Sequence, residues 1–157
     1  MSTVESRIAE LGLSLPEVPA PIAAYIPAVQ TGNLVFTSGQ LPTVDGKLLA
    51  SGIVGSHEGD VDIETAKRCA AQSGLNALAA VKGVIGDLDR VVRIVKLTGF
   101  VASRPEFADH GQITNGASEI LKEIFGEAGI HARSSVGMAS LPLNAPVEIE
   151  LIVEVRP

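Results

Sequence analysis

The sequence contains no tryptophan, and aromatic side chains make up only 3% of its 157 residues. Hydrophobic residues nevertheless account for 46% of the chain and charged residues for 19%, which is typical of a globular protein and not of a disordered one. The core must therefore be built mainly from Val, Ile, Leu and Ala. A chain of this length suits one domain.

Cysteine is also scarce: Cys69 is the only one, so the chain cannot form an internal disulfide, which fits a reducing compartment. Its position beside Ala70 in a predicted helix favours a core role over that of a nucleophile. Because His57, His110 and His131 show no metal-ligand spacing, we expect no zinc site. The sequence also contains no glycine-rich phosphate-binding loop and no GxSxG motif.

Positive charge is not in excess, since 12 Lys and Arg stand against 18 Asp and Glu, giving a net charge of −6. The basic residues are scattered, which argues against a nucleic-acid partner because phosphate backbones are bound through clustered positive charge. The N-terminus lacks the pattern of a secretory signal, and no apolar run is long enough to cross a bilayer. We therefore expect a soluble cytoplasmic protein with no membrane partner.

Apolar periodicity predicts a short amphipathic helix at residues 3–12, followed by elements in the order β-β-α-β-α-β-β. The proline-rich stretch 15–21 cannot form a helix or a central strand. We therefore assign residues 1–20 to an N-terminal helix and connector, and residues 21–157 to a single domain. The strands are predicted at 33–42, after the Asp45-Gly46 turn, at 88–102, 135–139 and 146–155, and the helices at 62–82 and 113–125.

The balance of helices and strands predicts an α+β fold. The longer helix is expected to begin at Asp60 or Asp62 and to end at Gly83. Two helices cannot cover both faces of a mixed sheet of five to six strands, so both should pack on one face. Strand alternation places three glutamates, Glu148 and Glu150 among them, on the other face of the last strand. Because unpaired buried carboxylates are destabilising, that face should meet water or another subunit, or line a polar cleft.

Arg133 is the first candidate for a functional residue. Its permanent charge stands among small residues in HARSSVGMASLP, just before a predicted strand. Its planar side chain with five donors matches a carboxylate or phosphate, and the small neighbours leave room for a ligand. A salt bridge to one of the glutamates, or a solvated side chain, is the alternative.

Glu148 and Glu150 are the second candidates, since a carboxylate on a shared strand face can orient water or transfer a proton. Solvated glutamates are the alternative. In the turn Ser38-Gly39-Gln40, the glycine allows a ligand close to the backbone, although a plain turn needs no ligand.

Two further polar residues have a structural and a functional interpretation. Asn115 either caps the second long helix or contacts a ligand, and capping is the simpler interpretation. Tyr25 is the only tyrosine, and a lone tyrosine is usually packed half-buried with its hydroxyl paired.

Several of these segments together resemble the RidA/YjgF family of small enamine and imine deaminases, whose members are also named endoribonuclease L-PSP or translation-inhibitor-like proteins. The resemblance extends from about residue 21 to residue 155, and the N-terminal helix is similar to the longer YjgF-like subgroup. The similar segments are Tyr25 followed by TGNLVFTSGQLP, then VVRIVKLTGFVA, PEFADHGQITNGASEILKEIFG and ARSSVGMASLPLNAPVEIE.

The resemblance implies a chorismate-mutase-like α+β fold, assembled as a homotrimer with ligand clefts between subunits and no cofactor. The implied reaction is hydrolysis of 2-imino or enamine acids to 2-keto acids and ammonia. Arg133 would grip the carboxylate of this small substrate, and Glu148 would place water or a proton. The implied substrate-binding positions are Tyr25, Ser38, Gly39, Asn115 and Ser135.

The chain departs from the family pattern at three positions beside the arginine. Family members often have Pro in place of His131, Cys in place of Ser135 and a charged residue in place of Gly137. Two alternatives to a deaminase follow: a non-catalytic protein that binds a small carboxylate metabolite in the same cleft, and an endoribonuclease. The acidic balance and the absence of a basic or aromatic track argue against the endoribonuclease.

Overall fold

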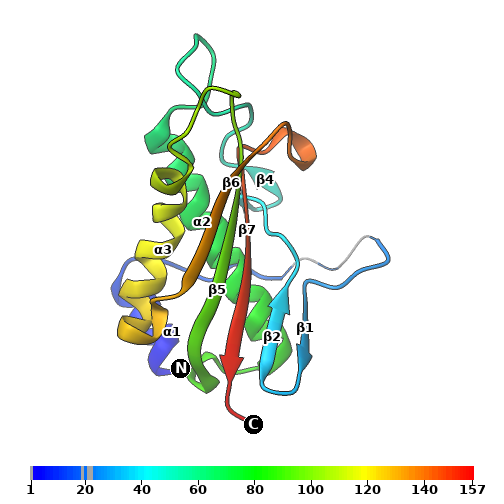
Figure 1. Cartoon of the computed structure of the whole chain (residues 1–157). Helices are drawn as coiled ribbons and strands as arrows, with labels where there is room; N and C mark the ends of the chain where they lie inside the picture. Colours follow the sequence, from blue (N-terminus) through cyan, green and yellow to red (C-terminus); the bar gives the residue numbers. More distant parts are fainter. Residues whose placement is uncertain (1, 19, 21–22) are drawn as a thin grey trace.

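A computed structural model describes residues 2–18, 20 and 23–157. Pro19 and Pro21, two residues of the predicted connector, lie outside this set. A five-stranded sheet runs through the molecule, and the two long helices lie on one of its faces (Figure 1). In the part of the chain that the structure describes, no helix combines the length and the apolar character needed to cross a membrane.

The sheet has the strand order β1-β2-β7-β5-β6. It is mixed, because β5 and β6 run parallel and are joined through a helix, while the other neighbouring strands run antiparallel. The predicted α+β fold is therefore confirmed. The strands are β1 (Ala28–Thr31), β2 (Leu34–Thr37), β5 (Val91–Ala102), β6 (Ala132–Met138) and β7 (Val147–Val155).

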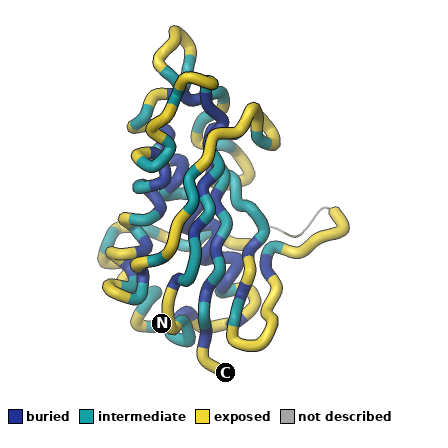
Figure 2. The backbone as a smooth tube through the Cα atoms, in the orientation of Figure 1, coloured by how far each residue is buried: buried dark blue, intermediate teal, exposed yellow. Residues whose placement is uncertain are grey.

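The two long helices, α2 (Ile63–Ile85) and α3 (His110–Phe125), pack against each other and against one face of the sheet. β7 shows the consequence, because its five apolar residues at alternate positions are buried while the residues between them are partly exposed. Buried residues lie between sheet and helices, and exposed residues follow the edge strands β1 and β6 (Figure 2). The prediction that one sheet face stays uncovered by helices is confirmed.

The predicted N-terminal helix is present as α1 (Thr3–Glu10), which buries Ile8. The backbone N–H groups of Thr3 and Val4 each donate to the carboxylate of Asp89 at 2.8 Å. A carboxylate at the N-terminus satisfies free backbone donors there, so Asp89 fixes this helix to the body of the domain.

The ends of α2 confirm one sequence prediction and correct another. Asp62 is the N-cap, and its side chain accepts a hydrogen bond from the Thr65 backbone at 2.8 Å. The prediction that Gly83 ends the helix is wrong, because the helix continues to Ile85. Gly86 ends it instead, with a left-handed φ of 80° that favours glycine.

Two strand predictions also need correction. The sequence pattern does not predict β1, an edge strand of four residues, three of them exposed, that follows Pro27. The predicted turn at Asp45-Gly46 is present, with φ values of 52° and 77°. It joins β3 (Thr43–Val44) to β4 (Lys47–Leu48), which form a separate two-stranded sheet and do not extend the main one.

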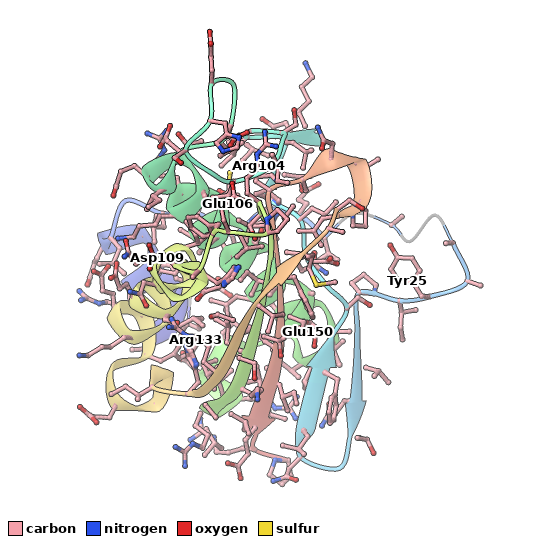
Figure 3. The ribbon with its side chains drawn as sticks, turned by 45° about the horizontal axis from the view of Figure 1, so that its top comes forward. Tyr25, Arg104, Glu106, Asp109, Arg133 and Glu150 are labelled. Atoms are coloured by element: carbon pink, nitrogen blue, oxygen red, sulfur yellow. The ribbon has the colours of Figure 1, made fainter. Side chains whose placement is uncertain are left out.

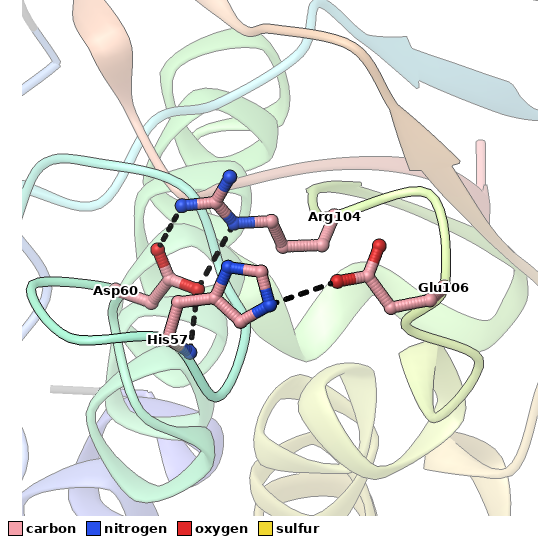
Figure 4. A network of polar contacts seen from close by, with 4 residues as sticks. All are labelled: His57, Asp60, Arg104 and Glu106. Carbon is pink, nitrogen blue, oxygen red and sulfur yellow. Dashed lines mark hydrogen bonds and ion pairs between the residues drawn. The ribbon is translucent and has the colours of Figure 1, made fainter.

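A polar network joins the loop before α2 to the segment after β5 (Figure 4). Arg104 donates to both carboxylate oxygens of Asp60, at 2.8 and 3.1 Å, and the His57 backbone N–H donates to the same carboxylate at 3.0 Å. His57 also lies 3.2 Å from the Glu106 carboxylate. The Asp60 side chain is only 3% exposed, so it links two loops and does not cap α2.

Candidate functional site

Arg133 lies inside edge strand β6, since the strand begins at Ala132 and not at the predicted residue 135. In the parallel pairing with β5 it stands beside Leu97, which is fully buried under the helices. Residues paired in register project to the same face of a sheet, so Arg133 projects to the side covered by α3.

The Arg133 guanidinium is oriented by two neutral side chains of α3. Its Nη1 donates to Oδ1 of Asn115 at 2.7 Å and to Oγ of Ser118 at 3.2 Å. No carboxylate forms an ion pair with Arg133 among the described residues, although the side chain is exposed. The salt-bridge interpretation is therefore wrong, and the charge stays available to an anionic ligand.

Asn115 lies inside α3, where it orients Arg133. The N-cap of α3 is Asp109, and Asn115 lies in the second turn, where its amide oxygen accepts from Arg133. The capping interpretation is therefore wrong. Ser118, three residues later on the same helix face, was not among the predicted residues; its spacing from Asn115 was the signal that could have identified it.

Ser135 and Gly137 follow Arg133 at alternate positions and therefore also face α3. The Ser135 hydroxyl lies 2.5 Å from that of Thr114, a fully buried residue. A Cβ on residue 137 would lie 2.6 Å from Nε2 of His110, which is too close for a real contact. The chain departs from the family pattern on this strand at Ser135 and Gly137. Ser135 fits Thr114 of α3, and Gly137 fits His110.

Glu148 lies on the opposite face of the sheet. It pairs with Phe100 of β5, three residues after Leu97, and an odd spacing along a strand reverses the face. A Cβ on Gly39 would overlap the Glu148 carboxylate, so the glycine allows this carboxylate to lie against the backbone of the turn after β2. The Glu148 side chain therefore packs directly against the Ser38-Gly39-Gln40 turn.

The Glu148 carboxyl is electrostatically unusual. Burial raises its pKa, and the neighbouring Glu150 raises that pKa further because two like charges oppose ionisation. None of the hydrogen bonds between described residues involves the Glu148 side chain. A half-buried carboxyl with a raised pKa keeps its proton to a higher pH than an ordinary glutamate and can donate it to a bound substrate.

Ser38 and Tyr25 lie near the same turn. The Ser38 hydroxyl donates to the Ile26 carbonyl at 2.6 Å, which ties the turn to the segment before β1. Tyr25 is 58% exposed, so its interpretation as a half-buried packing residue is wrong. An exposed aromatic side chain beside the turn is available for contact with another molecule.

The predicted site residues therefore fall into two groups. The arginine half, on β6 and α3, contains Arg133, Asn115 and Ser135. The glutamate half, around the turn after β2, contains Glu148, Gly39, Ser38 and Tyr25. β6 and β1 are opposite edges of the sheet, and Arg133 and Tyr25 accordingly lie on opposite sides of Glu150 in Figure 3. One chain does not bring the two halves together.

The described residues contain no group of three or more His, Cys, Asp or Glu side chains able to hold a metal ion. Cys69 is fully buried, as its predicted core position requires, and burial raises the pKa of its thiol, which disfavours the reactive thiolate. The candidate site therefore offers the guanidinium of Arg133 and the carboxyl of Glu148.

The fold and these two halves define a class of small α+β proteins with a chorismate-mutase-like architecture. A family model described as "YjgF/chorismate_mutase-like, putative endoribonuclease" matches residues 5–155. The chain belongs to this YjgF family.

Similar proteins cover almost the whole chain. Protein TCP17 of Trypanosoma cruzi is 38% identical over 154 residues, covering 98% of this chain and 94% of TCP17. A 2-iminobutanoate/2-iminopropanoate deaminase of Dermatophagoides farinae is 32% identical over 145 residues, covering 92% and 95% of the two chains.

Two solved structures show how well the fold is shared. The Agrobacterium tumefaciens protein Atu1372, of unknown function, superposes with a TM-score of 0.89 at 47% identity and covers 98% of this chain and 93% of its own. Escherichia coli TdcF with bound serine has a TM-score of 0.63 at 26% identity, with coverages of 90% and 94%.

Proposed function

We propose that the chain hydrolyses 2-imino or enamine acids to 2-keto acids and ammonia, in a cleft that two subunits of a homotrimer build together. The observation that carries the proposal is the Arg133 guanidinium, which is oriented by Asn115 and Ser118 and has no carboxylate partner in the described part of the chain. Relatives named as imine deaminases, and the serine-bound TdcF structure, support a small substrate that carries a carboxylate.

The separation of the two halves supports the proposed assembly. Arg133 and Glu148 lie on opposite faces of one sheet, so a site that uses both needs Arg133 of one subunit and Glu148 of the next. A ring of subunits makes such head-to-tail contacts repeatedly and closes without a free end. The uncovered sheet face carries exposed apolar side chains, Phe36 and Val136 among them, that a neighbouring subunit would cover.

The proposed reaction uses one anchor and one proton carrier. Arg133 binds the carboxylate of the imino acid and fixes the adjacent C=N carbon in the cleft. The protonated Glu148 donates its proton to the imine nitrogen, and water adds to the carbon. The resulting carboxylate takes a proton from the added water and returns it to the amine nitrogen. As the C–N bond breaks, the carboxylate takes the remaining hydroxyl proton, so ammonia and the keto acid leave and Glu148 is protonated again. Neither oxidation nor reduction occurs.

One observation favours a second candidate, a binding protein without turnover. The Ser135 hydroxyl, which stands where family members often have Cys, is bonded to Thr114 and is less available for chemistry. Such a protein would bind keto acids through Arg133 but release no ammonia from imines.

The test measures ammonia release from 2-iminobutyrate, generated in situ from the amino acid by an oxidase, with and without the purified protein. The proposal expects a rate above that of buffer, lost in Arg133→Ala and in Glu148→Gln. Binding of 2-oxobutyrate without any acceleration, over a panel of imino acids, supports the second candidate and overturns the first.

A further inference from the structure

Arg133 also forms part of the wall of a pocket of about 330 Å³, between the C-terminal half of α3 and the segment that leads into β6. Ser118 and Lys122 of α3 line one side, and Ile130 and His131 line the other. The pocket therefore extends from the proposed carboxylate anchor toward a second cationic side chain. Neither the proposed anchor nor the proton carrier requires this extension.

The pocket has a net positive charge. Lys122 has no carboxylate partner among the described residues. The acid in the wall, Glu119, lies 4.0 Å from Lys67 of α2 and is partly neutralised there. Two cations, Arg133 and Lys122, therefore face one space with little opposing charge, and a ligand with two anionic groups would compensate both.

The positions of Ser118 and Lys122 on α3 indicate the length of such a ligand. Ser118, which holds the Arg133 guanidinium, and Lys122 are four residues apart, which is about 6 Å along a helix. In a five-carbon dicarboxylic acid, four C–C bonds of about 1.5 Å in zigzag separate the carboxylate carbons by about 5 Å. The flexible Lys122 side chain can close the remaining difference.

We propose that Lys122 binds a second carboxylate of the substrate, so that the preferred substrates are dicarboxylic 2-imino acids, formed from acidic amino acids. This inference rests on the proposed function, because Arg133 must hold the carboxylate next to the imine. The exposed Ile130 contacts the carbon chain between the two acidic groups. The reaction that supplies the substrate must then oxidise or eliminate from an acidic amino acid.

At pH 8 the contribution of Lys122 to binding can be measured without a charge on His131. Its Nδ1 lies 3.0 Å from the Ala132 carbonyl oxygen, which can only accept, so Nδ1 carries a proton and Nε2 is the titrating nitrogen. Burial lowers the pKa of His131 below its ordinary value. At pH 8 the imidazole is neutral, and the cations in the pocket wall are Arg133 and Lys122.

The experiment measures binding of 2-oxoglutarate and 2-oxobutyrate by calorimetry at pH 8, using the intact protein. These keto acids are stable analogues of the dicarboxylic and monocarboxylic imines. Wild type should bind 2-oxoglutarate at least about fivefold more tightly, as one further ion pair allows. Lys122→Ala should remove that preference and leave 2-oxobutyrate binding unchanged, and Lys122→Glu should reverse it.

Lys47→Ala is the matched control, since it removes the same charge from the exposed β3–β4 hairpin. It should leave both affinities unchanged. Equal binding of the two acids by wild type, a failure to bind either, or an equal loss in Lys47→Ala and Lys122→Ala overturns the proposal. A dicarboxylate preference without turnover of any imine supports the Lys122 site and refutes the deaminase, so the two failures are distinguishable.

Discussion

The Arg133 guanidinium is held by the Asn115 side chain through a hydrogen bond of 2.7 Å, in which a neutral amide oxygen accepts from a charged donor. A neutral partner orients the guanidinium without cancelling its charge. A carboxylate in the same place would do both. The identity of residue 115 therefore decides whether Arg133 is an anchor for ligands or half of an internal ion pair.

Asn115→Asp should weaken binding of 2-oxobutyrate by about tenfold, because an internal carboxylate competes with that of the ligand for Arg133. Asn115→Ala should weaken it less, since it loosens the guanidinium but leaves the charge free. Calorimetry measures both affinities. Asn144→Asp is the control, because it makes the same substitution at an exposed position outside α3, in the segment before β7, and should leave binding unchanged. Undiminished affinity in Asn115→Asp would show that Arg133 does not bind the carboxylate.

Gly39→Ala should reduce kcat by up to about a hundredfold, because the new Cβ overlaps the Glu148 carboxylate and displaces the proposed proton carrier. Ligand affinity should change much less, since Arg133 lies elsewhere. Gly83→Ala is the matched control: its Cβ would make an ordinary contact of 3.5 Å with Val18, and it should leave kcat unchanged. A Gly39→Ala enzyme with the kcat of wild type would remove Glu148 from the mechanism.

Gly137→Ala should destabilise the protein by about 1–3 kcal/mol, because the added methyl group collides with His110 and with the Ser103 hydroxyl that His110 contacts at 3.1 Å. Urea unfolding measures the change. In a His110→Ala background the same substitution should cost about 1 kcal/mol less, since the collision is relieved. Equal costs in the two backgrounds would mean that the glycine is needed for some other reason.

Asp60→Asn should destabilise the protein near neutral pH, because it removes the charge that binds Arg104. The hydrogen bond from Arg104 is the main cause that holds the pKa of Asp60 below its ordinary value of 3.8. The stabilisation is therefore complete above pH 3.8 and is lost as the pH falls through the lower folded value. The difference between wild type and variant, measured by urea unfolding at several pH values, should shrink below pH 3.8. A difference that grows there would contradict the assigned pKa direction.

Much of the architecture could be predicted from the sequence, because apolar periodicity reports directly on burial. The strict alternation of residues 147–155 predicts both the strand β7 and its buried face. The α3 pattern likewise predicts a helix, although His110, at its first position, lies three residues before the predicted start. The ends of helices and strands are harder to predict, since a glycine such as Gly83 can either end a helix or lie inside one. Tertiary packing then determines where the helix ends.

The sequence identified candidate residues for the site but not their arrangement in space. The type and neighbourhood of Arg133 and Glu148 singled them out, whereas their placement on opposite faces depends on the strand order and register of the whole sheet. The partners on α3 that fit Ser135 and Gly137 are likewise distant in sequence. The sequence did not predict β1, because a short, exposed edge strand has little apolar periodicity.

Mixing two inactive variants tests most directly whether the site is built from two subunits. Arg133→Ala and Glu148→Gln should each be inactive alone, and each should still fold and assemble. When equal amounts are unfolded together and refolded, about one quarter of the clefts should combine an intact Arg133 with an intact Glu148 from the neighbouring subunit.

The control mixes Arg133→Ala with the double variant Arg133→Ala/Glu148→Gln, which can form no intact cleft. The measured quantity is ammonia release from 2-iminobutyrate, compared with refolded wild type. A site shared between subunits predicts recovery to about one quarter of the wild-type rate. No recovery, in a mixture whose oligomers are shown by mass spectrometry to contain both variants, would contradict it.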